Sequence, residues 1–474
     1  MLPPLIRRPR KSAKLRSGER GFTMALVAGS FVAIIAMAAL SIDVGTLYQA
    51  KAEAQRAADA AALAGARTIS ISGITGDPTN GASDGSWGDI CGSDTSPASV
   101  AAKNAGQQNL ISGVVAPTIN VYYGAGSTAA TNLDCRNAGP NFAVNPVVTV
   151  TVQSANLPIF FARIFSLFGS NFSATTVGAK ASAEVYNPSQ SGVLASMIPV
   201  QPRCVKPLIV ANKDPGNGGP LVDATGTIAN PGISQLGSGV IGETFTIRAD
   251  CWSTFTDCNP PDLAGGGHMI DNPPTAPTTT LLDYIPAFVN TNSGAVPACS
   301  SATVFQQAIG GCDQTTVYSC GVALATEADM TINPGGGSGT GDTATAAQCL
   351  THSTGGADSL AGGTTPTFPF QIQAGAGNLL KNVGVNTGDT ITSSSSIVTL
   401  PIGYFSSTGL AFGQNQPFVT IAGYLQVFVQ SIDPPTGNMV VTVLNVAGCG
   451  NAVTSGTAYV TGTSPVPVRL ITSP

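Results

Sequence analysis

The sequence predicts an α+β protein that begins with a transmembrane helix, extends it by an Ala-rich helical stem, and continues into a small α+β unit and a mainly antiparallel, β-rich ectodomain. Three observations carry this prediction: an uncharged apolar run, a following run of strong helix formers, and many short alternating segments separated by Gly, Pro and Ser. The predicted boundaries are 1–21 for a basic cytoplasmic segment, 22–42 for the transmembrane helix, 43–67 for the stem, 68–187 for the α+β unit and 188–474 for the ectodomain.

The composition restricts the functional classes. Only 9% of the 474 residues are Asp, Glu, Lys or Arg, whereas roughly 25% is usual in soluble domains. This low charge excludes a nucleic-acid-binding protein, a coiled-coil rod and a charge-rich disordered chain. Hydrophobic residues make up 43% of the chain, which is enough for a sizeable core. Composition therefore indicates architecture and compartment but no activity.

The N-terminal charge pattern predicts a single membrane crossing. Phe22 to Ile42 carries no charged residue and is long enough to span a hydrocarbon core of about 30 Å. Because basic flanks stay in the cytoplasm, we expect the N-terminus inside and the acidic body in the periplasm or outside the cell. The alternative is a cleaved signal peptide that ends at Ala36-Met37-Ala38. The basic residues before the run are Arg7, Arg8, Arg10, Lys11, Lys14, Arg16 and Arg20.

The predicted stem carries a stripe of small side chains. Alanines recur at a spacing of four residues, which places them on one face of a helix. Small residues let another helix approach closely, so we predict that the stripe packs against a partner helix. The alternative is that alanine is present only because it is a good helix former. The stripe consists of Ala50, Ala54, Ala58, Ala62 and Ala66.

Ten cysteines follow the apolar run, and their even number favours disulfides in an oxidising compartment. The sequence does not determine their connectivity, but the close neighbours Cys251/Cys258 and Cys312/Cys320 are the easiest to pair. The candidates are Cys91, Cys135, Cys204, Cys251, Cys258, Cys299, Cys312, Cys320, Cys349 and Cys449.

Local patterns predict the elements beyond the stem. In the α+β unit, short helices are expected at 98–112 and 157–168. Strands are expected there at 142–153 and 172–186, where β-branched or small residues alternate with others. The many strands of the ectodomain favour a sandwich-like or irregular β domain. Its clearest predicted strands are 205–211, 244–249, 396–404, 418–431 and 439–446.

Asp43 follows the apolar run directly, where a charge is tolerated although one at the membrane centre would be costly. We expect either a contact with a partner's charge or free amine during assembly, or a solvated end to the membrane segment. Elsewhere the sequence predicts no catalytic, cofactor or metal site. It holds only two histidines, His268 and His352, and no Gly-x-Ser-x-Gly elbow in a strand–turn–helix setting, so we expect no enzyme. Cys349 and His352 could begin a zinc site, but no second close pair of ligands accompanies them.

The N-terminal motifs resemble those of TadG-like proteins of the bacterial tight-adherence (Tad, Flp-type) pilus-assembly system. The resemblance implies a non-enzymatic protein anchored in the inner membrane of a bacterial cell envelope, with pilus-assembly proteins or pilins as partners. Residues 157–186 also resemble the continuation seen in that family. The motifs are Gly18-Glu-Arg-Gly-Phe-Thr-Met-Ala, Ser41-Ile-Asp-Val-Gly-Thr-Leu-Tyr and Ala57-Ala-Asp-Ala-Ala-Ala-Leu-Ala-Gly-Ala.

Two alternatives stay open at this point. Arg20-Gly21-Phe22-Thr23 resembles a prepilin-peptidase site, but Leu26 stands where pilins usually carry Glu. Processing at Gly21 or at Ala38 is therefore undecided. The second candidate function is a secreted or surface-attached β-rich adhesin whose N-terminal signal is removed, with cell adhesion as its role.

Overall fold

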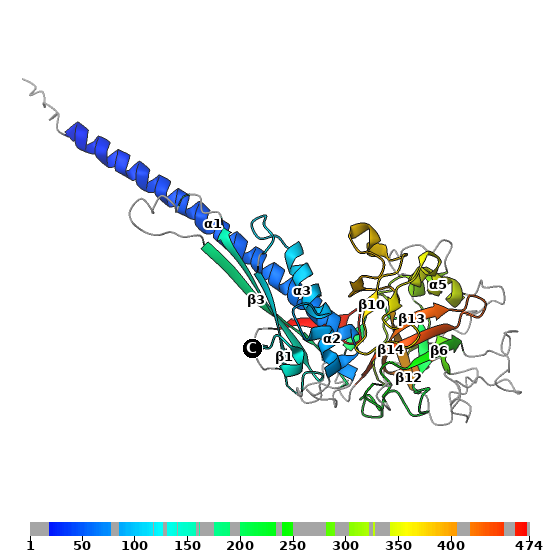
Figure 1. Cartoon of the computed structure of the whole chain (residues 1–474). Coiled ribbons are helices and arrows are strands. Elements are labelled where there is room, and N and C mark those ends of the chain that lie inside the picture. Colours follow the sequence, from blue (N-terminus) through cyan, green and yellow to red (C-terminus); the bar gives the residue numbers. More distant parts are fainter. Residues whose placement is uncertain are drawn as a thin grey trace, which may run out of the picture.

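The computed structural model of the chain confirms the mixed α+β class. One long N-terminal helix leads into a body of mostly antiparallel sheets (Figure 1). The structure describes residues 19–76, 85–116, 118–126, 130–139, 141–157, 161, 175–189, 200–233, 239–249, 281–289, 303–321, 326–327, 342–404, 418–449 and 460–471.

Helix α1 (Glu19–Ile71) is continuous over 53 residues and is therefore about 80 Å long. No proline interrupts it, and its second half is dominated by alanine, the strongest helix former. Figure 1 shows its first half projecting from the body and its second half lying beside the strands. The predicted transmembrane segment and the stem that extends it form one continuous helix, as the sequence predicts.

The second half of α1 lies on a four-stranded antiparallel sheet of order β1-β2-β3-β16, the first sheet. The expected strands at 142–153 and 172–186 and the helix at 98–112 are present, but the last strand returns from the C-terminal end of the chain. The predicted boundary at 187 misses this return. The elements are α2 (Gly88–Cys91), α3 (Pro97–Gln108), β1 (Thr118–Ala125), β2 (Pro146–Leu157), β3 (Thr175–Val185) and β16 (Val468–Ile471).

Beyond the first sheet with its helices, the chain forms a second unit, and six of its strands form a closed ring. In the order β12-β5-β7-β6-β14-β13 each strand pairs with the next, and β13 pairs again with β12. We call this ring the barrel. It differs from the expected sandwich because closure leaves the ring no open sheet edge. The β12–β5 and β6–β7 pairs are parallel and the others antiparallel. Its strands are β5 (Leu208–Ala211), β6 (Thr244–Ala249), β7 (Leu281–Pro286), β12 (Ile397–Tyr404), β13 (Phe418–Ile432) and β14 (Met439–Gly448).

Smaller elements surround the barrel. A two-residue strand pairs with one end of β13, and the remaining short strands form a parallel pair and a three-stranded antiparallel sheet. The expected helix at 157–168 lies largely outside the described residues, and its first residue, Leu157, ends β2. The elements are β4 (Val200–Pro202), α4 (Val304–Gly310), β8 (Thr326–Glu327), α5 (Asp342–Thr351), β9 (Ser359–Leu360), β10 (Ile372–Gln373), β11 (Thr390–Ile391) and β15 (Val460–Gly462).

Two hydrophobic cores hold these layers together. One lies between α1, α3 and the first sheet, and the other fills the barrel and the helices beside it. Ile71, the last residue of α1, belongs to the barrel core, and Phe368 packs against both cores. The end of α1 therefore lies between the two units.

Three disulfides join described cysteines: Cys91–Cys135, Cys204–Cys312 and Cys320–Cys449. Cys312 and Cys320, which proximity in sequence makes easy to pair, instead bind Cys204 and Cys449, which lie 108 and 129 residues away. Cys349 is also disulfide-bonded, and no described cysteine is free. Residues 251, 258 and 299, with the expected Cys251/Cys258 pair, lie outside the described residues.

Candidate functional site

The first half of α1 is exposed on all sides although it is apolar. Phe22 is 71% exposed and Ile35 65%, and the most apolar stretch of the helix has no buried residue. A helix that is hydrophobic all round is normally surrounded by lipid or protein. By length and composition this is a candidate membrane-spanning helix.

Asp43 marks the point where α1 enters the body. Its side chain is only 3% exposed, and both carboxylate oxygens accept the backbone N–H of Phe161, at 3.0 and 3.3 Å. A solvated end to the membrane segment is therefore wrong for this residue. The carboxylate is bonded within its own chain, where the expectation was a contact with a partner. Sequence inspection could not find Phe161, because it lies 118 residues further along the chain.

The predicted alanine stripe is buried inside the protein: Ala50, Ala54, Ala58, Ala62 and Ala66 are all at most 1% exposed. Helix α3 and strands β2 and β3 cover it. At Gly65 a side-chain carbon would lie 3.2 Å from Ala102 of α3 and 3.1 Å from Val148 of β2. Small residues thus allow the close approach that the spacing predicts, but the partner helix comes from the same chain.

Buried side chains of the barrel bind the C-terminal end of α1. Asn445 of β14 donates from Nδ2 to the Ser70 carbonyl at 2.7 Å and to Gln426 Oε1 at 2.8 Å. Its Oδ1 accepts the hydroxyl of Thr75 at 3.3 Å. All four residues are fully buried. Because the last carbonyls of a helix have no partner within it, Asn445 satisfies a group that would otherwise be buried unbonded.

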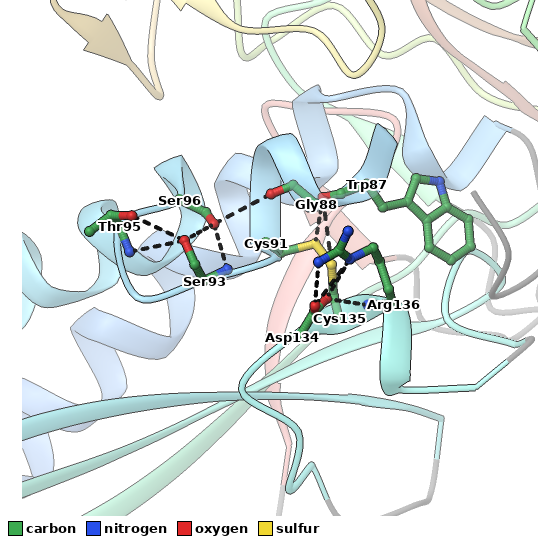
Figure 2. A network of polar contacts seen from close by, with 9 residues as sticks. All are labelled: Trp87, Gly88, Cys91, Ser93, Thr95, Ser96, Asp134, Cys135 and Arg136. Carbon is green, nitrogen blue, oxygen red and sulfur yellow. Dashed lines mark hydrogen bonds and ion pairs between the residues drawn. A yellow bond between two sulfur atoms is a disulfide. The ribbon is translucent and has the colours of Figure 1, made fainter. Parts of the chain in front are cut away.

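A disulfide stabilises the segment that covers α1. Figure 2 shows the Cys91–Cys135 bond below the carbonyl of Trp87, with Arg136 bonded to Asp134 beside it. The Arg136 guanidinium lowers the pKa of the Asp134 carboxyl, chiefly through this hydrogen bond. The Cys91–Cys135 disulfide joins α2 to the connection between β1 and β2. Because α3 follows α2 in the chain, the disulfide fixes the position of α3 on the stem. Closing a loop over a sequence separation of 44 residues gives it a stabilising role.

A pair of carboxyl groups beside the barrel, one buried and one half-buried, was not found from the sequence. Asp214 is fully buried and accepts the Gly216 N–H and the Asn217 amide, at 2.9 and 2.8 Å. Burial, together with the hydrogen bond to Asp214 and its charge, raises the pKa of Glu243 to about 8. The raised pKa favours the protonated form of Glu243 beside the Asp214 carboxyl. A methyl group at Gly216 would overlap the Glu243 carboxyl.

The described residues offer little other chemistry. They contain no group of three His, Cys, Asp or Glu side chains that could hold a metal ion. His352 precedes a short 3-10 turn with a positive φ of 52°, and His268 lies outside the described residues. Lys206 is buried, which lowers its pKa to about 8, and its amine donates to the Gly311 carbonyl.

The packing of the stripe predicts that Ala58→Leu destabilises the protein. Extra methyl and methylene groups at a fully buried site should cost about 1–3 kcal/mol, while the helix itself tolerates leucine. Arg56→Gln, on the exposed side of the same turn, is the matched control and should change stability by less than about 0.5 kcal/mol. Denaturant unfolding of the detergent-solubilised chain measures both. Wild-type stability for Ala58→Leu would contradict the burial of the stripe.

The carboxyl pair predicts a pH-dependent stability. Because the pKa of Glu243 is higher in the folded state than in the unfolded chain, its contribution is fully present at low pH and is lost as the pH rises toward about 8. Glu243→Gln cannot ionise and should raise the melting temperature relative to wild type above that pH. Thermal unfolding between about pH 5 and pH 9 checks this, with the exposed Asp94→Asn as control. Parallel profiles for Glu243→Gln and wild type would contradict the raised pKa of Glu243.

Comparison with known proteins identifies only the helix. No curated protein and no solved structure matches the chain. The match to a family model does not extend to 157–186, where the resemblance stays a prediction. Residues 21–68, which form most of α1, match the family described as putative Flp pilus-assembly TadE/G-like, and this confirms the TadG-like resemblance of the N-terminal segment.

Proposed function

We propose that the chain is a non-enzymatic component of a Tad-type pilus or envelope assembly, held in the bacterial inner membrane by the first half of α1. The body would act by anchoring or by contact with other assembly proteins or pilins. The observation that carries this proposal is the contrast within one helix. Its apolar half, residues 22–42, is exposed, and we call it the bare half. Its alanine half is buried in the body, and the family match covers both halves.

Two features support an N-terminus in the cytoplasm and a body in the periplasm or outside the cell. Seven basic residues precede Phe22, and basic flanks are retained in the cytoplasm. The disulfides of the body suit an oxidising compartment. Contact is favoured over catalysis because the sequence holds only two histidines and no recognisable nucleophile motif.

The continuity of α1 favours the anchored protein over a secreted adhesin. Helix α1 runs without a break through Ala36-Met37-Ala38, the candidate signal cleavage site. It also carries the buried alanines that cover the first sheet. A helix that is continuous from the apolar run into the core is well suited to hold the body at a defined position relative to a membrane.

Two charges in the bare half of α1 test the anchor. Val32→Arg together with Ile35→Arg should release the chain from alkaline-washed membranes, because each arginine at the middle of a span costs about 2.5–3.5 kcal/mol. Tyr48→Arg, equally exposed but beyond the apolar run, is the matched control and should stay in the pellet.

The mass of the mature chain and a reporter fused at Gly85 complete the test. We expect a chain that retains residues 22–42 and a reporter on the non-cytoplasmic side. A mature chain that begins after Ala38 and is recovered in the medium would instead establish the secreted alternative.

A further inference from the structure

The body of the protein begins at the membrane boundary, with no spacer between them. Asp43 is the first residue after the apolar run, and it already binds Phe161 of the connection between β2 and β3. Eight residues on, the Lys51 amine donates to the Gly178 carbonyl, and Gln55 donates to the Lys180 carbonyl at 3.2 Å. Strand β3 therefore runs along α1 with its first residues nearest the bare half.

The chemistry of the Asp43 contact suits a site next to hydrocarbon. In water, neither a carboxylate nor a backbone N–H needs a protein partner. Close to lipid, both are costly unless they are bonded. The Asp43 carboxylate and the Phe161 N–H satisfy each other at the level where the apolar run ends. The aromatic ring of Phe161 remains 39% exposed there.

We propose that Phe161 lies in the interfacial layer of the bilayer, so that the membrane-facing end of the first sheet contacts lipid. The inference rests on the proposed membrane anchor. The headgroup layer extends about 5–8 Å beyond the hydrocarbon core on each side, and Asp43 begins that layer. Lipid is the occupant because Phe161 is bonded to Asp43, whose neighbours Ile42 and Val44 are exposed apolar residues of α1. The body then rests on the membrane. Its orientation is fixed by two contacts with lipid, one through the apolar half of α1 and one through Phe161.

A second exposed apolar site supplies a control. The turn that carries Val114 is bound to α1 through the Ser112 N–H, which donates to Glu53 at 2.6 Å. Glu53 lies ten residues after Asp43, about 15 Å further along the helix. Val114 is 58% exposed but should lie in water beyond the headgroups. Val114 is also apolar and is more exposed than Phe161, so it serves as the control for depth.

The test is depth-dependent quenching of an introduced tryptophan. Phe161→Trp and Val114→Trp are made in the full chain and reconstituted into phosphatidylcholine vesicles, with wild type as background for the two native tryptophans. Lipids brominated high on the acyl chain should quench Trp at 161 at least about twofold more than wild type, and aqueous iodide should not. Trp at 114 should show the reverse.

The outcomes separate the inference from the proposed function. If wild type does not float with the vesicles, the membrane anchor fails. If it floats but iodide quenches Trp at 161 and bromolipid does not, the anchor stands and the lipid contact is overturned. Protection of Trp at 161 from both quenchers also overturns the lipid contact and indicates a protein partner. Adding Asp43→Ala to Phe161→Trp should reduce bromolipid quenching, and unchanged quenching would contradict the role of the Asp43 contact.

Discussion

The hydrogen bond from Asn445 to the Ser70 carbonyl at the end of α1 is the interaction on which the arrangement of the two units depends. The Ser70 carbonyl lies in the last turn of α1, where no further backbone N–H of the helix can donate to it. Asn445 of the barrel binds it, and Gln426 and Thr75 hold Asn445 in place. Because all these groups are buried, losing one bond would leave polar atoms unsatisfied at about 1–3 kcal/mol each. The barrel therefore has one preferred position on the helix.

This constraint extends along α1 toward its exposed apolar half. The alanine stripe brings α3 and the first sheet into close contact with the helix. Asp43 binds Phe161 at the point where α1 enters the body. Strand β16 returns from the C-terminal region to the first sheet, so the two units are also joined by the chain itself. A single helix thus links the candidate membrane-spanning segment to both cores. For a protein proposed to be anchored by α1 and to act by contact, this link would set where its surfaces lie relative to the bilayer.

Local signals predicted the helix and most long strands, whereas long-range pairing was out of reach. The uncharged run and the alanine spacing are properties of neighbouring residues, so α1 and its buried face could be read directly. The contact of Asp43 with Phe161 spans 118 residues, and that of Asn445 with Ser70 spans 375. No periodicity encodes such contacts. The same reason explains why the partners of Cys312 and Cys320, the closure of the barrel and the proximity of Asp214 to Glu243 could not be predicted.

The most direct test of a single, continuous structural unit is hydrogen exchange of the intact chain in lipid nanodiscs. If α1 and the barrel are held together as described, the amides of residues 50–71 should exchange as slowly as those of β13 and β14. Asn445→Ala should accelerate exchange at the end of α1 and in β14 together, whereas Asn104→Ala on the exposed face of α3 should not. Rapid exchange of residues 50–71 beside a protected barrel would contradict the account.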